Sequence, residues 1–301
     1  MRMLRSVLAT LITLLSCTSA FAWGSKGHQI IANVGASLAT EGKSFWQANL
    51  TPMQQMSTVP DRVWKSSATK PLEEENHWFQ VDYYYTPENF ENVSSYPTSY
   101  PEAVNQYSET TVAKNGTAPW RIRQFYQLSL NAFKKGNLEA GLAYAGIITH
   151  YVGDLSQPLH ASENYDGQKT GNKGIHSFFE TTVISNEANT RAEVLKRAQK
   201  LMKSKIFRAQ SVNTLAKDLF AEVHRSAEQI DLVLQNDDTY GRNAKGVAVQ
   251  LDLATDRMAD GAATLAKILS QLWKESGLAA NAKALTIKDP AFIKPEFSQL
   301  K

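Results

Sequence analysis

The chain has 301 residues, of which 43% are hydrophobic and 20% are charged, with six histidines and one cysteine. This length is enough for one large domain with a single core. The formal net charge of +3 includes two arginines in the first 22 residues, so the remainder carries no strong field to attract nucleic acid or an acidic membrane. Charge therefore leaves the substrate open.

Residues 1–22 have the features of a secretory signal peptide. Two arginines precede a short apolar run, and Ala20-Phe21-Ala22 is a typical cleavage site. The run is too short to span a membrane. Cleavage after Ala22 predicts a secreted or periplasmic protein, residues 23–301, without disulfides because Cys17 is removed. The alternative is lipoprotein processing at Cys17, which would leave Trp23 without a free amine.

The first half of the mature chain mixes helical and irregular patterns. Apolar residues recur at helical spacing from His28 to Asn49, which predicts the first helix. Asp61 and His77 lie in sequence without periodicity and are expected in loops or short turns. Segment 81–118 is rich in Tyr, Pro, Ser and Asn and is predicted to be irregular, its tyrosines forming either a wall over a site or ordinary packing.

From Pro119 onward the pattern is helical. One helix is predicted up to Gly136, and the next begins at Asn137, ends before Pro158 and should be central and buried. The other predicted segments are helices from 175 into the 180s, at 191–206, 212–234 and 244–272, and a loop at 236–243. Without an alternating strand pattern or a repeat, the sequence predicts an all-α, single multi-helical domain. The tail 275–301 is too short for a separate lipid-binding domain.

Histidines and carboxylates gather between His150 and Glu180. His150 with Asp154, and His176 with Glu180, are each four residues apart, so each pair shares one face of a helix. One such pair is usually a surface ion pair, but two pairs with His160 between them predict a metal site. Imidazole and carboxylate ligands suit zinc.

Signal cleavage would create a further ligand, because a free α-amine at Trp23 can bind a metal ion. The remaining histidine, His224, is expected on an exposed helix face. The full set of candidate ligands is Trp23, His28, Asp61, His77, His150, Asp154, His160, His176 and Glu180.

This order of ligands resembles the trinuclear zinc enzymes that comprise bacterial zinc-dependent phospholipases C and S1/P1 nucleases. The resemblance rests on the Trp-Gly start with His28, on the isolated Asp61 and His77, and on the motifs His-x₃-Asp-x₅-His and His-x₃-Glu. It implies three zinc ions. The first would be held by Asp61, His77, His150 and Asp154, the second by bridging Asp154 with His28 and the amine and carbonyl of Trp23, and the third by His160, His176 and Glu180.

The resemblance also implies hydrolysis of a phosphate ester by in-line attack. Metal binding lowers the pKa of water to about 7, which makes a nucleophile available near neutral pH. Asp61 is the candidate catalytic carboxylate that orients or deprotonates this water. Arg62 is either a phosphate contact or a solvated side chain.

The two branches of the family differ near the last ligand. The nucleases usually end with His-x₃-Asp after a longer link that contains Gly-Gly-Asn, whereas here the last ligand is Glu180 and fifteen residues separate His160 from His176. The Trp-Gly-x-x-Gly-His start is closer to the nucleases. We therefore expect a secreted, monomeric phospholipase C acting on a phospholipid such as phosphatidylcholine, with no stable nucleic-acid partner. The alternatives are an S1/P1-type single-strand nuclease or 3′-nucleotidase, and a zinc protein without catalysis.

Overall fold

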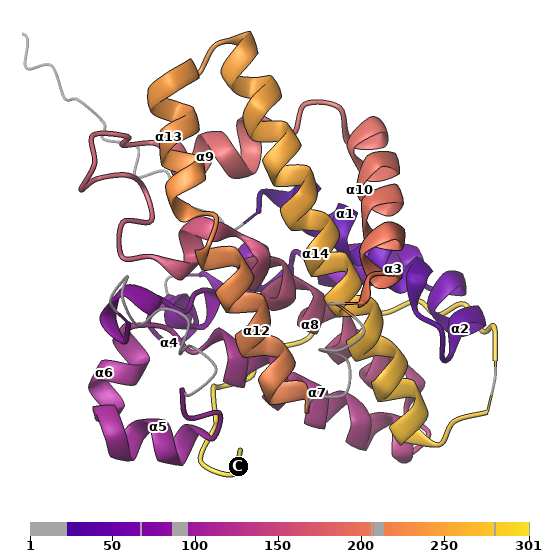
Figure 1. Cartoon of the computed structure of the whole chain (residues 1–301). Helices are drawn as coiled ribbons and strands as arrows, with labels where there is room; N and C mark the ends of the chain where they lie inside the picture. The colour runs from indigo at the N-terminus through magenta and orange to yellow at the C-terminus, as the bar shows by residue number, and fades with distance from the viewer. Residues whose placement is uncertain are drawn as a thin grey trace, which may run out of the picture.

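A computed structural model describes residues 23–66, 68–85, 96–205, 207, 214–279 and 281–300. Within these ranges the chain forms helices and no strands, which confirms the all-α prediction (Figure 1). The predicted signal peptide, residues 1–22, lies outside the described residues. No helix in the described ranges is both long and apolar enough to cross a bilayer.

The α-helices are α1 (Ser25–Leu38), α2 (Lys43–Ala48), α3 (Leu50–Met56), α4 (Lys70–Glu73), α5 (Tyr100–Tyr107), α6 (Glu109–Lys114), α7 (Ala118–Lys134), α8 (Leu138–Ser156), α9 (Ile175–Ser177), α10 (Glu187–Met202), α12 (Leu215–Ala227), α13 (Ile230–Tyr240) and α14 (Ala244–Ser276). Short turns join them: the π-helical η1 (Pro60–Trp64) and η6 (Phe178–Thr182), and the 3₁₀-helical η2 (Glu74–His77), η3 (Val81–Tyr83) and η5 (Pro158–Ala161).

Helix α8 lies at the centre of the molecule, as its small apolar residues predict. It packs against α7, α3, α14, α1 and α12, and every residue from 145 to 156 is buried. Two glycines allow this close packing. A Cβ at Gly146 would lie 2.3 Å from Cβ of Met56 on α3, and one at Gly153 would lie 2.8 Å from Nδ1 of His28 on α1.

Several predicted boundaries are wrong. The helix expected at 28–49 is two helices, because the chain turns at Gly42, whose φ of 66° favours glycine. The helix expected at 212–234 is divided between α12 and α13, and α13 continues to Tyr240 through part of the expected loop 236–243. Ser99 and Ser108 cap two helices, α5 and α6, inside the segment expected to be irregular.

The tyrosines of segment 81–118 form a packed aromatic cluster. Tyr96 stacks on Tyr107 at a centroid distance of 5.5 Å, and Tyr84 lies edge-on to both. Phe79 and Phe220 also lie against the Tyr96 ring. The observed contacts therefore agree with ordinary packing.

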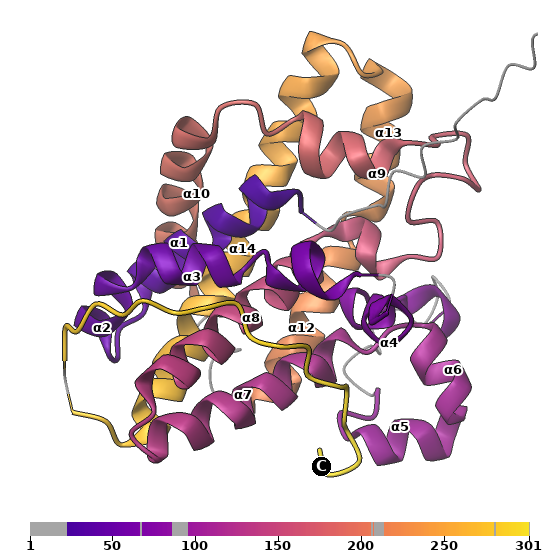
Figure 2. The ribbon, with the colours of Figure 1, turned by 180° about the vertical axis from the view of Figure 1, so that it is seen from behind.

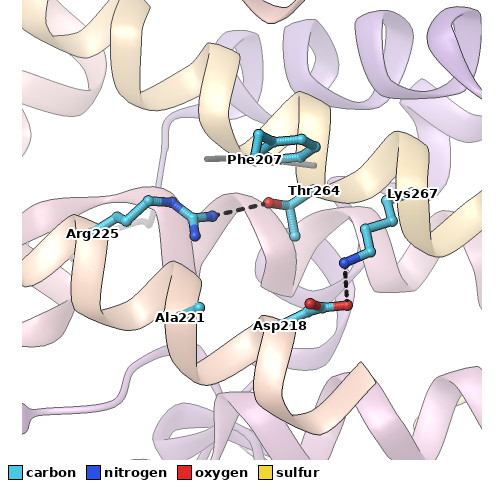
Figure 3. A pocket seen from close by; sticks show the side chains of 6 residues that line it. All are labelled: Phe207, Asp218, Ala221, Arg225, Thr264 and Lys267. Atoms are coloured by element: carbon cyan, nitrogen blue, oxygen red, sulfur yellow. Dashed lines mark hydrogen bonds and ion pairs between the residues drawn. The ribbon is translucent and has the colours of Figure 1, made fainter. Parts of the chain in front are cut away.

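A buried charge network joins α12 to α14 and binds the end of α8. Glu222, fully buried, pairs with Arg225 and Arg257, and Arg257 donates to the Ser156 carbonyl at 3.1 Å. His224 is partly exposed and lies 3.5 Å from Glu228, close to the expected exposed face. A small pocket beside this network is shown in Figure 3, with about 10 Å³ open to a water molecule. That space fits one water and no substrate.

Candidate metal centre

Two of the predicted carboxylate ligands lie in π-helical turns, which are rare and frequent at functional sites. Asp61 lies in η1 and Glu180 in η6. The other side-chain ligands come from α1, η2, α8, η5 and α9, and those of α8, His150 and Asp154, lie in its C-terminal half. The structure thus brings all eight predicted side chains into one region, in three groups whose ligand atoms lie within 4.8 Å of one another.

The first group, the Asp61 group, consists of Asp61, His77 and His150. Nδ1 of His77 and Nε2 of His150 are 3.0 Å apart, and each lies 3.8 Å from Oδ1 of Asp61. The second group, the His28 group, consists of His28, His150 and Asp154.

Asp154 faces both of these groups. Its Oδ2 lies 2.9 Å from Nδ1 of His77 and 3.3 Å from Nε2 of His150, while its Oδ1 lies 3.5 Å from Nε2 of His28. This division of the two oxygens is the geometry that a bridging carboxylate needs.

The third group, the His160 group, consists of His160, His176 and Glu180. Nε2 of His176 lies 3.3 Å from Nε2 of His160 and 2.8 Å from Oε2 of Glu180. The four-residue spacing of His176 and Glu180 thus places both side chains on one face, although α9 passes into the π-turn η6 between them.

The ring nitrogen that faces away from each group is held by a backbone carbonyl in three of the histidines. Nδ1–H of His150 donates to Ser57 at 2.7 Å, that of His160 to His77 at 2.6 Å and that of His176 to Tyr165 at 3.0 Å. These hydrogen bonds leave Nε2 of each ring with a lone pair directed at its group, as in known metal-binding histidines.

Burial controls the protonation of the centre. It lowers the pKa of His28, His77, His150 and His160 well below the ordinary value, which keeps these imidazoles neutral. Burial and repulsion from Asp61 raise the pKa of Asp154 well above its usual range. A set of neutral imidazoles around costly buried carboxylates is stabilised by a bound cation.

Unpaired buried atoms are a second observation that indicates a metal ion in this centre. Within the described chain, three buried atoms of the centre have no hydrogen-bond partner, namely both ring nitrogens of His28 and Oδ1 of Asp154. Buried polar atoms are rarely left unpaired, and these all belong to predicted ligands. The mixture of imidazole nitrogen and carboxylate oxygen suits zinc.

Trp23 is anchored beside the centre, although its backbone amine belongs to none of the side-chain groups. Its indole N–H donates to Oγ of Ser156 at 3.1 Å and its ring lies 5.5 Å from that of Phe179. The next residue, Gly24, donates its N–H to the carbonyl of Glu180 at 3.2 Å. These contacts hold residue 23 between the ends of α8 and η6.

Glu73 is a residue of the centre that the sequence interpretation missed. It is fully buried, and its Oε1 lies 3.3 Å from Nε2 of His77, the ring nitrogen opposite the Asp61 group. It also accepts hydrogen bonds from the Tyr151 hydroxyl and, at 2.9 Å, from Arg121. Carboxylates in this position orient ligating histidines. The signal was present, because Glu73 and His77 have the same four-residue spacing as His150 and Asp154.

The cation beside Asp61 is Lys65, whereas Arg62 has a half-exposed side chain and agrees with the solvated alternative, the more common one for an arginine that follows an aspartate. Arg62 points to the surface and pairs with Asp289 at 2.8 Å. Nζ of Lys65 lies 2.8 Å from Oδ1 of Asp61. Burial lowers the pKa of Lys65, but the nearby carboxylates, chiefly Asp61, outweigh it and leave this pKa above the ordinary value. Lys65 is therefore a charged ammonium group within the centre.

Tyr165 is a second residue that spacing alone did not indicate. Its side chain is 45% exposed, and its ring lies edge-on to that of His176 at a centroid distance of 6.0 Å. It therefore offers an open aromatic face at the edge of the His160 group.

Comparison with known proteins agrees with this geometry. A family model described as S1/P1 Nuclease matches residues 23–274. The chain belongs to the S1/P1 nuclease family. This assignment confirms the resemblance that the ligand order indicated, and the family match begins at Trp23.

Individual relatives of this S1/P1 family chain match more distantly. A phospholipase C of Clostridium novyi is 28% identical over 144 residues, covering 48% of this chain and 31% of the relative. A probable serine protease of Bradyrhizobium tropiciagri is 34% identical over 92 residues, covering 25% of this chain and 12% of the relative. The alpha-toxin structure of Clostridium perfringens has a TM-score of 0.51 at 17% identity, covering 84% of this chain and 65% of the toxin chain, and shows the same fold. The chain spans less than half the length of these two curated relatives.

Proposed function

We propose that this protein is a secreted, zinc-dependent phospholipase C that hydrolyses a phospholipid to diacylglycerol and a phosphorylated headgroup. The observation that carries the proposal is the compact His160 group, which ends in Glu180 after a link of only fifteen residues. The match to a phospholipase C of Clostridium novyi supports it. Residues 1–22 would be the signal peptide and residues 23–301 the enzyme, acting as a monomer.

Asp61, His77, His150 and Asp154 would hold one zinc ion, His28 and Asp154 with the amine of Trp23 would hold a second, and the His160 group would hold the third. When bound, zinc lowers the pKa of water and neutralises charge on phosphate oxygens. Asp61 would accept a proton from the attacking water, since its Oδ1 faces the centre and pairs with Lys65. The ammonium of Lys65 would stabilise the negative charge that develops on the phosphate.

The buried walls of the centre exclude bulk water. His28, His77 and His150 are almost completely inaccessible, so charges between them interact more strongly than in solvent. Tyr165 at the edge of the His160 group would contact the headgroup, and a quaternary ammonium is the cation that an aromatic face binds well.

The family model itself favours a second candidate, a single-strand nuclease or 3′-nucleotidase. The Trp-Gly-x-x-Gly-His start at residue 23 agrees with it. Such an enzyme needs aromatic platforms on which bases stack. The exposed face of Tyr165 would serve for this as well.

The decisive experiment compares substrates and one variant. The purified protein is assayed against phosphatidylcholine vesicles, single-stranded DNA and a 3′-nucleotide, and Asp61→Asn is assayed beside it. We expect lipid turnover, and in Asp61→Asn a loss of about 100-fold or more with an unchanged fold. Hydrolysis of DNA or nucleotide without lipid turnover would replace the first candidate by the second. If the Asp61→Asn protein kept its zinc and hydrolysed the substrate at the wild-type rate, Asp61 would not be the group that accepts the proton from water.

A further inference from the structure

The last described segment, residues 281–300, forms an extended strap over the helical domain. It lies beyond the family match, which ends at residue 274. Figure 2 shows it in yellow, passing over α3 and α8 and ending near α5. The side chain of Asn49 binds its backbone in both directions, donating to Lys283 and accepting from Leu285, each at 2.8 Å.

The middle of the strap contacts η1, the turn that carries Asp61. The indole N–H of Trp64, the last residue of η1, donates to the carbonyl of Pro290 at 3.1 Å. Arg62 in the same turn pairs with Asp289 at 2.8 Å, and Gln55 at the end of α3 donates to the same carboxylate at 3.0 Å. Both flanks of Asp61 are therefore tied to the strap.

The strap also reaches His77 through two buried side chains. Nη2 of Arg121 donates to the carbonyl of Ile293 at 2.7 Å and to Glu73 at 2.9 Å. Glu73 in turn lies 3.3 Å from the outer ring nitrogen of His77. The strap carbonyl thus satisfies a fully buried guanidinium that orients the carboxylate behind a metal ligand.

The ring of Phe292 packs against both residues that bind the strap backbone, Trp64 and Arg121. It lies edge-on to Trp64 at 5.8 Å and 5.8 Å from the guanidinium carbon of Arg121. By contrast, within the described ranges no hydrogen bond of the strap goes to segment 158–182, which carries the His160 group.

We propose that residues 281–300 act as a positioning strap for one metal group, holding Asp61 and His77 in the geometry that binds zinc. The physical reason is that η1 is a π-turn, a rare form of helix of only five residues, and its own few backbone hydrogen bonds are supplemented by those of the strap. Arg121 needs the Ile293 carbonyl in the same way, because a buried donor without an acceptor is costly. The inference rests on the proposed zinc site. A strap that merely covers the core would stabilise the fold without affecting any single ion.

The test uses two matched alanine substitutions, each of which removes one aromatic side chain of the strap from the full-length protein. Phe292→Ala removes the ring beside Trp64 and Arg121. Phe297→Ala removes a ring of the same strap that packs on Tyr100, 5.1 Å away and outside these contacts. Zinc affinity is measured by competition with a chelator, and cobalt substitution gives the visible absorption of each bound ion. Thermal melting is followed for both variants.

We expect Phe292→Ala to lower the affinity for one of the zinc ions by about 10-fold or more, which is the range for residues that orient metal ligands. Its cobalt spectrum should change, while Phe292→Tyr restores both properties. Phe297→Ala should lower the melting temperature and leave zinc affinity and the spectrum unchanged. If Phe292→Ala bound zinc as tightly as wild type, or if both alanine variants lost zinc affinity equally, the positioning role of the strap would be wrong and the proposed function would stand. A wild-type protein that binds no zinc would overturn the proposed function together with the strap.

Discussion

The Asp61 group and the His160 group differ in how the chain assembles them. The His160 group comes from one stretch of the chain, from residue 160 to residue 180, through η5, α9 and η6. The Asp61 group joins η1, η2 and α8, and is braced by Glu73, Arg121 and the strap. A locally encoded group depends mainly on its own backbone, whereas a group made from distant segments depends on the packing that brings them together. Changes remote from the site should therefore affect the Asp61 group more.

Removal of all metal should have the largest effect. Exhaustive chelation should abolish hydrolysis and lower the melting temperature by roughly 10 °C or more, because each ion at a large excess over its Kd contributes about 4 kcal/mol. Without cations, Asp154 is a buried acidic group among the neutral imidazoles of His28, His77 and His150. Calorimetry with and without chelator, after metal analysis, measures the shift.

Amide exchange on the metal-free protein sharpens the comparison. Protection should fall more in η1 and η2 than in η5 and α9, since an ion that bridges distant segments closes longer loops. An unchanged melting temperature after verified metal loss would contradict a stabilising metal centre.

The second prediction concerns the N-terminus. One extra methionine before Trp23 would replace its free amine by a peptide nitrogen, which has no lone pair to donate. We expect loss of most of one zinc equivalent and a rate decrease of roughly 100-fold, equal to about 2.7 kcal/mol. The His160 group, which contains no part of the N-terminus, should keep its ion. Metal analysis and turnover of this variant beside the protein that begins at Trp23 provide the measurement.

Equal zinc and equal rate in these two proteins would show that the amine is no ligand. Lipoprotein processing at Cys17 would then be the better interpretation of the first 22 residues.

The sequence predicted the locally encoded group better than the assembled one. In the His160 group, the spacing of His176 and Glu180 matches the helix period, and Pro158 begins the turn η5 that carries His160. These signals require no knowledge of tertiary contacts, and the structure places the residues accordingly. The all-α fold was predictable for the same reason, since helical periodicity is a local property.

What the sequence did not show depends on long-range packing. Arg62 is adjacent to Asp61 in sequence, but the π-turn directs it to Asp289 and brings Lys65 to the carboxylate. Glu73 is one of three consecutive acidic residues, and its four-residue spacing to His77 acquires a meaning only through its burial against Arg121. Strap residues such as Phe292 have no periodic pattern. Their partners on η1 and α7 lie far away in sequence.

The third prediction tests the brace of the Asp61 group. Glu73→Gln keeps the shape of the side chain but removes the charge that orients His77, so we expect hydrolysis to fall about 10- to 100-fold with weaker binding of one zinc ion. Glu74→Gln is the matched control, because the Glu74 side chain is partly exposed and its nearest cation, Nζ of Lys70, is 3.6 Å away. Chelator competition should show the ion of the His160 group unaffected. Identical behaviour of the two glutamine variants would mean that Glu73 does not act on the metal site.

The smallest effect should come from Tyr165, at the edge of the locally encoded group. Its ring lies edge-on to the His176 ring, but the hydrogen bond that orients His176 goes to the backbone carbonyl of Tyr165, which the substitution keeps. Tyr165→Ala should therefore keep all zinc and most of kcat, while KM for phosphatidylcholine rises about 3- to 10-fold, in line with one cation–π contact. Tyr165→Phe keeps the aromatic face and should behave as wild type. Because backbone and side chain have separate roles here, a loss of zinc in Tyr165→Ala would show that the His160 group is less self-sufficient than its local sequence implies. An unchanged KM would show that Tyr165 does not contact the headgroup and that another residue recognises it.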